Sequence, residues 1–421
     1  MEFIMDNLGA VLGILFSIIY FYQLVYILVG LFQKPVEFQA GTNHRYGVLI
    51  SARNEENVIA NLIESIQSQK YPRELVDIFV VADNCTDATA EAARRAGAIV
   101  YERFDQSLVG KGYALNYLLH QIDREYILDT YEGFFVFDAD NLLDENFIAE
   151  MNKVFDSGYD ILTGYRNSKN IGDNWISSGY GLWFLREARF VNQARMQLGT
   201  SCHVSGTGFL VRTTVLKENG GWKHHLLTED IEFTVDQVIH GACIGYCKNA
   251  ILYDEQPTTF AASWRQRIRW SKGFYQVFFH YGKQLLAGIF KPGGFACYDM
   301  FILLFPGIAM SLGGAAGAVL SLGLMLLDQG VGMWLLHSIS QMLLITCIDT
   351  YVGFFALGAL TTAAEWKQIH CSTRKKILYL FTFPIFMASY VPISIVAMFS
   401  KVTWKPIPHT VVKKVADIQR I

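Results

Sequence analysis

The chain has 421 residues, of which 52% are hydrophobic and only 17% are charged. Charged residues make up about a quarter of an ordinary soluble protein, so this composition predicts that part of the chain lies in lipid. The formal net charge of −3 gives no reason to expect nucleic acid as a partner. The seven cysteines have no paired spacing pattern that would predict a disulfide framework.

The first predicted element is a membrane helix. Residues Leu8 to Gln33 form 26 positions without a charge, and a spanning helix needs about 20. The start of the chain is acidic, with Glu2 and Asp6, unlike a cleaved signal peptide. We therefore expect an uncleaved anchor over residues 1–40. The first basic residue after it is Lys34, and the positive-inside rule puts the chain from residue 34 onward in the cytosol.

Residues 41–257 predict a soluble domain in which strands alternate with helices. Apolar, β-branched runs predict strands at Tyr46–Ala52, Ile78–Ala82 and Phe134–Phe137. Helical patterns follow over residues 58–66, 86–96, 112–122 and 146–155. This alternation is typical of an α/β fold with a mostly parallel sheet covered on both faces. In such sheets, ligands bind beyond the carboxyl ends of the strands.

Carboxylates gather where the predicted strands end. Asp83 follows the second strand, and Asp138 and Asp140 follow a later one. A buried strand should not end in bare carboxylates unless something pairs them, and Mg²⁺ binds one or two carboxylates together with substrate phosphates. The alternative for this segment is a solvated turn in which Asp140 or Asn141 caps a helix.

Two further segments carry candidate substrate-binding groups. Lys111, flanked by glycines, can reach a diphosphate, although its spacing is not that of a Walker loop. Thr228, Glu229 and Asp230 open a helix that runs to about residue 240. Thr228 is a good N-cap residue and acids are common in a first helical turn, so a structural explanation stays open. The functional alternative is that Asp230 is a general base that takes a proton from an acceptor hydroxyl.

Residues 258–295 predict interfacial helices and contain the most unusual motif of the chain. On a helix, Gln266, Arg269 and Trp270 share one face because they are three and four positions apart. The arginine fork suits a diphosphate. We expect three neighbours to lie at the lipid headgroups instead: Trp264, Arg265 and Arg267.

These motifs resemble those of the membrane-bound processive glycosyltransferases of family 2, such as cellulose, chitin, hyaluronan and poly-N-acetylglucosamine synthases. The resemblance covers about residues 47–273. It rests on five segments in order: Ser51-Ala52-Arg53-Asn54-Glu55, the Asp83 segment, Asp138-Ala139-Asp140, Thr228-Glu229-Asp230 and Gln266-Arg267-Ile268-Arg269-Trp270. It implies a GT-A (Rossmann-like) fold and an inverting, processive transfer from a UDP-sugar donor to a growing β-linked glycan acceptor. The predicted spans on both sides of the domain add the hypothesis of a channel that exports the polymer as it grows.

The same resemblance implies a role for each candidate residue. Asp230 would activate the acceptor hydroxyl, and Asp140 would bind the Mg²⁺ or Mn²⁺ that neutralises the leaving diphosphate. Trp270 would stack against the terminal sugar. The residues implied in substrate binding are Glu55, Asp83, Lys111, Asp138, Glu229, Gln266, Arg269 and Trp270.

Residues 296–400 predict further transmembrane helices, and residues 401–421 form a short C-terminal tail. Apolar runs over 300–327, 329–364 and 377–400 predict three spans. Three spans would put the tail outside, whereas its lysines favour the inside. Prolines interrupt the last run, which fits a broken or re-entrant segment, and we favour a cytosolic tail. We therefore expect a multi-pass protein of a bacterial cell membrane with a cytosolic catalytic domain.

Two other functions stay open. The enzyme could add a single sugar to a lipid-linked acceptor without processive elongation. Asp349, inside an apolar run, is typical of ion paths and favours a transporter with a regulatory domain, but that function leaves the five motifs unexplained. We expect Asp349 to face other helices or cavity water. The predicted partners are the UDP-sugar, the glycan acceptor and membrane lipid, and the sequence identifies neither the sugar nor a protein partner.

Overall fold

The computed structural model describes residues 2–305, 323, 329–403, 409 and 411–419. An eight-stranded mixed sheet forms its centre, with the strand order β3-β2-β1-β4-β7-β6-β8-β5. The strands are β1 (Tyr46–Ala52), β2 (Val76–Asp83), β3 (Ile99–Arg103), β4 (Gly133–Asp138), β5 (Leu142–Leu143), β6 (Ile161–Ser168), β7 (Phe209–Arg212) and β8 (Gly245–Asp254).

The strands that carry the predicted carboxylates are parallel neighbours. β1 pairs in parallel with β2 and β4, and β2 pairs in parallel with β3. In the register of these strands, Ala52 lies beside Ala82, and Ser51 lies beside Asp138. β7 is antiparallel to β4 and β6, whereas β6 and β8 are parallel. The predicted α/β fold with a mostly parallel sheet is confirmed, and the ends of β1, β2 and β4 meet at one edge.

Helices cover both faces of the sheet. Successive side chains of a strand point to opposite faces, so β1 and β4 each contribute to a hydrophobic cluster on either face. Leu49 and Phe134 pack with α4, whereas Val48 and Phe135 pack with α2 and α5. The helices of this part are α2 (Ile59–Gln67), α3 (Thr89–Arg95), α4 (Lys111–Tyr126), α5 (Phe147–Asp156), α6 (Trp175–Glu187), α7 (Gln193–Gln197), α8 (Thr213–Glu218), α9 (Glu229–Ile239) and α10 (Phe260–Gly288).

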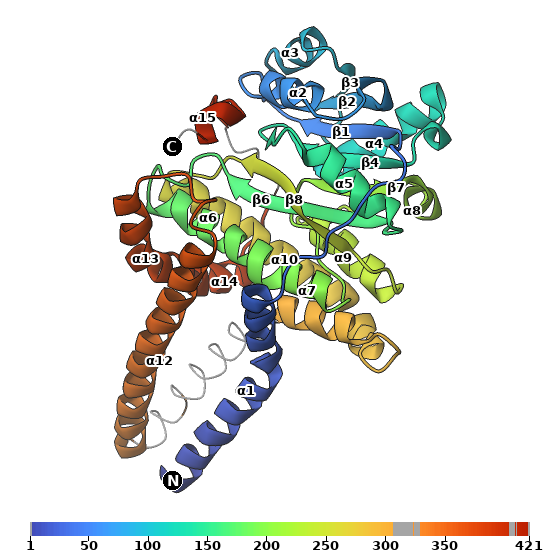
Figure 1. Ribbon diagram of the computed structural model, residues 1–421. Helices are drawn as coiled ribbons and strands as arrows, with labels where there is room; N and C mark the ends of the chain where they lie inside the picture. The colour runs from blue at the N-terminus through green and yellow to red at the C-terminus, as the bar shows by residue number, and fades with distance from the viewer. Residues whose placement is uncertain (1, 306–322, 324–328, 404–408, 410, 420–421) are drawn as a thin grey trace.

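Two long helices extend away from the sheet, α1 (Glu2–Phe32) and α12 (Gln329–Ala364) (Figure 1). Within the described ranges, two helical segments are long and apolar enough to cross a membrane, Leu344–Ala364 and Thr373–Phe399. The span predicted over 300–327 lies mostly outside the described residues. Among the described residues, Asp349 is exposed on α12.

The last apolar run is broken into α13 (Thr373–Ala388) and α14 (Tyr390–Phe399), as its prolines predict. Both ends of this segment contact the soluble domain. Before it, Asn167 Nδ2 donates a hydrogen bond to Gln368 O at 3.0 Å. After it, Val411 N donates to Glu255 Oε2 at 3.0 Å, and α15 (Val415–Gln419) packs near β5 and β8. Both ends of the segment thus lie beside the soluble domain, as expected for the predicted broken or re-entrant segment.

An arginine of α10 binds the break between α13 and α14. Arg267 is fully buried, and its guanidinium donates to Ser389 Oγ at 2.7 Å and to Phe386 O at 3.1 Å. The expectation that Arg267 lies at lipid headgroups is therefore wrong. A helix end leaves carbonyl groups without partners, and Arg267 satisfies one of them. Its neighbour Arg265 is exposed.

Candidate functional site

The predicted site residues line one cavity of about 1240 Å³. The ends of β1, β2 and β4 contribute to its wall, together with the first turns of α4 and α9 and one face of α10. The structure thus brings together all ten candidates, namely Glu55, Asp83, Lys111, Asp138, Asp140, Glu229, Asp230, Gln266, Arg269 and Trp270.

Asparagines turn the chain sharply where β1 and β2 end. Asn54 and Asn84 have φ angles of 59° and 53°, a left-handed conformation that Asn adopts more readily than most residues. Asn54 Oδ1 accepts a hydrogen bond from Thr86 N at 2.9 Å, and Asn84 Oδ1 accepts one from Asp105 N at 3.0 Å. These contacts fix the two loops that begin beside the cavity.

Cations pair with the carboxylates at the ends of β2 and β4. Arg103 donates to Asp83 Oδ1 at 2.6 Å, and both side chains are buried. Lys111, the first residue of α4, donates to Asp138 Oδ1 at 2.5 Å and to Gly206 O at 2.8 Å. Burial lowers the pKa of Lys111, but the carboxylates around it outweigh burial and raise that pKa. A permanent cation therefore lies inside the cavity.

Asp140 is buried but ionised. Its Oδ2 accepts a hydrogen bond from Glu255 N at 2.7 Å. Burial raises the pKa of Asp140, but the nearby His409 and Lys169 cations outweigh burial and hold that pKa below its usual range. Asp140 thus carries the negative charge that a metal ligand needs.

The C-terminal tail adds a residue that sequence analysis missed. His409 lines the cavity. Its Nδ1 donates to the carboxylate of Glu55 and lies 2.8 Å from Oε1 and 3.1 Å from Oε2. Burial lowers the pKa of His409, but Asp140 and the hydrogen bond to Glu55 raise it to about 10. No local pattern could predict this contact, because it depends on the path of the tail.

The first turn of α9 presents the predicted base. Burial raises the pKa of Asp230, and burial together with the charge of Asp230 raises the pKa of Glu229 to about 7. A raised pKa makes a carboxylate a stronger base near neutral pH, which suits proton transfer from a hydroxyl group.

Thr228 does not cap α9 with its side chain, so the structural explanation offered by the sequence, an N-cap residue, does not hold. Its side chain makes no capping hydrogen bond, and its buried Oγ1 has no partner among the described residues. Gly273 of α10 lies so close to Thr228 that an added Cβ would meet the threonine side chain at 2.5 Å. Arg269 Nη1 also donates to Leu227 O at 3.0 Å. Thr228 is thus packed against α10, and the two motifs form one unit.

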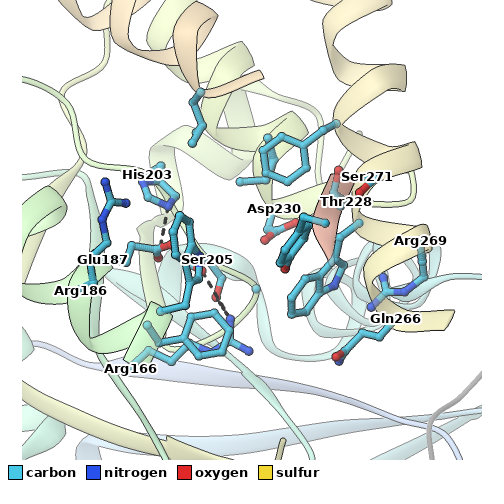
Figure 2. Close-up of a pocket in the computed structure, with 18 of the residues that line it drawn as sticks. Arg166, Arg186, Glu187, His203, Ser205, Thr228, Asp230, Gln266, Arg269 and Ser271 are labelled. Carbon is cyan, nitrogen blue, oxygen red and sulfur yellow. Dashed lines mark hydrogen bonds and ion pairs between the residues drawn. The ribbon is translucent and has the colours of Figure 1, made fainter. Parts of the chain in front are cut away.

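The opposite wall carries a second polar group that sequence analysis did not single out. Figure 2 shows Arg166, Arg186, Glu187 and His203 across the cavity from Asp230 and from Gln266 and Arg269 on α10. His203 Nε2 lies 3.2 Å from Glu187 Oε1. The only signal for this group in the sequence is the number of arginines in an otherwise apolar helical stretch over 175–197.

Comparison with known proteins identifies the chain at the level of a family. Residues 44–273, more than half of the chain, match the family described as "Glycosyltransferase like family 2". The chain belongs to this family. The predictions of a family 2 glycosyltransferase and of its fold class are thereby confirmed.

Two curated relatives of this family 2 glycosyltransferase differ in their products. It is 27% identical over 298 residues to the beta-monoglucosyldiacylglycerol synthase of Nostoc sp., covering 66% of the chain and 60% of the relative. It is 25% identical over 275 residues to the poly-beta-1,6-N-acetyl-D-glucosamine synthase of Staphylococcus epidermidis, covering 62% of the chain and 60% of the relative. The matches thus span less than two thirds of either relative.

A solved structure shows the same fold. A mannosyltransferase from Pyrobaculum calidifontis, in complex with GDP-Man and Mn²⁺, superposes with a TM-score of 0.56 at 18% identity. The match covers 86% of the family 2 chain and 98% of that structure. The likeness confirms the predicted GT-A-type architecture.

Proposed function

We propose that the chain is a hexosyltransferase that moves a sugar from a UDP-sugar to an acceptor hydroxyl beside Asp230, with inversion at the anomeric carbon. One observation carries this proposal. Carboxylates at the ends of parallel strands, a carboxylate on α9 and the Arg269–Trp270 face of α10 surround one cavity. Such a site offers carboxylates that can hold a divalent cation for the diphosphate of the nucleotide, and a base for the acceptor.

The proposed step is an in-line displacement. The acceptor hydroxyl loses its proton to Asp230 while its oxygen forms a bond to the anomeric carbon. The bond between that carbon and the diphosphate oxygen breaks, and its electron pair leaves with UDP. Lys111, Gln266 and Arg269 are positioned around the cavity to bind the departing charge, the kind of electrostatic stabilisation that usually dominates catalysis.

The residues present fit a divalent cation. Asp140 is ionised and lines the cavity close to Asp138 in sequence. Among the described residues, no three His, Cys, Asp or Glu side chains form a metal cluster. This fits Mg²⁺ or Mn²⁺, which commonly takes one or two protein carboxylates and completes its shell with substrate phosphates and water. Asp140 would hold the ion, which when bound neutralises the diphosphate.

Two candidate acceptors are supported by different observations. Trp270 offers a flat aromatic surface in the cavity that Asp230 also lines, which supports the predicted growing β-linked glycan, elongated processively and exported. A lipid-linked acceptor that receives a single sugar is supported by the apolar part of the cavity wall, which includes Leu303, Phe354 and Val391. We favour the lipid-linked acceptor because the cavity continues along helices that extend from the sheet.

The membrane arrangement supports a cytosolic site in a multi-pass protein of the cell membrane. The tail and the residues before α13 both contact the soluble domain, so the tail lies on the same side as the sheet. We retain the predicted division into an anchor (1–40), a catalytic domain (41–257), interfacial helices (258–295), transmembrane helices (296–400) and a tail (401–421).

The proposal is tested by incubating the purified chain with a panel of UDP-sugars and Mg²⁺ or Mn²⁺. UDP release and product size are measured with membrane lipids and with oligosaccharides as acceptors. A single-sugar lipid product supports the favoured acceptor, and a long polymer supports processive synthesis. No UDP release from any donor under any of these conditions would refute sugar transfer.

A further inference from the structure

The cavity extends from the carboxylates at the sheet edge to the helices that leave the soluble domain. On one side it is lined by Asp138, Asp140 and Asp230. On the other it is lined by Tyr22 and Gln23 of α1 and by residues 346–354 of α12, which lie inside a segment apolar enough to cross a membrane. A ligand that reaches Asp230 from this side passes between these helices.

Two arginines that line the cavity are paired with carboxylates. Arg166 lies 2.5 Å from Asp254, and Arg195 lies 2.7 Å from Asp299. Arg186 Nη2 donates to the neutral Gln23 Oε1 at 3.1 Å. The carboxylates whose charge reaches Arg186 belong to Glu187 and Asp299, and these are paired with His203 and Arg195. Within the described part of the chain, Arg186 makes no ion pair, and its buried Nε has no hydrogen-bond partner.

The surroundings of Arg186 hold its guanidinium in place. The group lies 4.8 Å from the ring centre of Trp183, one turn earlier on α6. A π-helical turn over Ala188–Asn192 follows α6, and such turns are frequent at functional sites. Arg186 is thus a fixed cation at the junction of α6 and α1, with capacity for a further acceptor.

We propose that Arg186 and Gln23 form a subsite for the anionic phosphate headgroup of a membrane lipid, which is the acceptor or carries it. This inference rests on the proposed sugar transfer and names the chemistry of its acceptor. A guanidinium presents paired donors that match a phosphate group. The apolar wall of the cavity, which includes Leu303, Phe354 and Val391, receives the acyl chains.

The lipid fits this wall better than a free glycan does. A glycan channel needs hydrogen-bonding groups along its length, whereas an acyl chain needs apolar contacts. Apolar residues within 302–304 and 384–391 supply such contacts in the wall of the same cavity. The polar head would lie across the cavity from Asp230, as Figure 2 shows for Arg186, so that a headgroup hydroxyl extends toward the base.

The test measures lipid binding without turnover. The full chain in neutral detergent micelles is titrated with phosphatidylglycerol that carries brominated acyl chains, which quench nearby tryptophans. The Trp183 component is obtained by subtracting the signal of a Trp183→Phe variant. Arg186→Gln is compared with Arg186→Lys and with Arg265→Gln, a matched loss of charge on the exposed side of α10. Thermal unfolding shows that each variant is folded.

Loss of one charge-assisted contact should raise the half-saturating phosphatidylglycerol fraction roughly tenfold in Arg186→Gln. It should rise less in Arg186→Lys and less than about twofold in Arg265→Gln, because an exposed charge contributes little. Brominated diacylglycerol, which has no phosphate, should quench both wild type and Arg186→Gln alike.

Equal curves for wild type and Arg186→Gln, or equal losses in Arg186→Gln and Arg265→Gln, would overturn the proposal. Inorganic phosphate that displaces the lipid at equal concentration would overturn the lipid assignment and leave a plain anion site. UDP release with an oligosaccharide acceptor is followed separately. Its absence in the wild type, alongside absent UDP release with lipid, would refute sugar transfer, whereas the quenching result judges the subsite alone.

Discussion

His409 Nδ1 lies 2.8 Å from Glu55 Oε1, although 354 positions separate the two residues in the chain. The contact joins the C-terminal tail to the loop after β1 and adds a cation beside the carboxylates at the sheet edge. Together with the contact of Val411 with Glu255, it links the tail to the proposed donor end of the cavity.

Tail docking should depend on pH. In the free tail, His409 has an ordinary pKa of about 6.5, whereas in the docked tail its pKa is about 10. A raised pKa means that the docked state binds the proton more tightly, so this stabilisation is complete below about pH 6.5 and is lost as pH rises toward 10. Hydrogen exchange over residues 409–419, measured without metal, should therefore accelerate across this interval.

The His409→Gln variant should lose this pH dependence. His120→Gln, on the exposed surface of α4, serves as the matched control and should keep it. Exchange that is independent of pH in the wild type, after correction for intrinsic rates, would contradict the role assigned to His409.

Much of the site could be predicted from sequence because it follows from the sheet. Asp83 and Asp138 end strands that pair with β1, so a parallel α/β pattern is enough to bring them together. The grouping of Gln266, Arg269 and Trp270 follows from helical spacing alone. These inferences depend only on local periodicity and on one topological rule.

The features that the sequence did not predict depend on long-range packing. His409 reaches the cavity through the path of the tail, and Arg267 is buried because a distant helix breaks at Ser389. Thr228 does not cap α9 because α10 packs against it through Gly273. Arg186 lies in an apolar helical stretch whose partner, α1, is far away in sequence. None of these contacts leaves a local pattern.

The close packing of α10 on α9 predicts the effect of adding one methyl group. Gly273→Ala places a Cβ about where Thr228 lies, and such overpacking costs about 1–3 kcal/mol. It should also separate the two motifs and lower kcat. Gly282→Ala, on the same helix, meets only Phe278 at an ordinary 3.6 Å and should stabilise the helix by about 0.5–1 kcal/mol.

Denaturant unfolding and UDP release measured on the two glycine variants check this prediction. Equal activity and equal stability in both variants would show that the contact between Gly273 and Thr228 is not needed to align α9 and α10.

Removal of metal should abolish sugar transfer, and Asp140→Asn should weaken the response to added metal. Residues that only support a metal ligand typically change metal affinity by roughly 10–100-fold when they are mutated. Loss of a direct carboxylate ligand should raise the half-saturating Mg²⁺ or Mn²⁺ concentration by at least this factor. Asp129→Asn, which removes an exposed carboxylate paired with Lys217, is the control. Full activity in the presence of a chelator would exclude the proposed role of Asp140.

Glu229 should add a second step to the pH–rate profile. Its pKa of about 7 means that it gains a negative charge beside Asp230 as pH rises through 7, and this charge strengthens the neighbouring base. We expect kcat/KM to rise in this interval in the wild type. In Glu229→Gln the rise near pH 7 should disappear, while the step at lower pH that belongs to Asp230 stays. An unchanged profile would contradict this coupling.

The most direct test of the proposed chemistry compares the wild type with Asp230→Asn in UDP release and in UDP binding. Loss of a general base should lower kcat by roughly 10²–10⁴-fold, while UDP still binds with nearly the same affinity because Asp230 does not contact the nucleotide in the proposed step. Asp236→Asn, on the same helix and paired with His224, should lower stability instead of kcat. An Asp230→Asn enzyme that transfers sugar at the rate of the wild type would contradict the account.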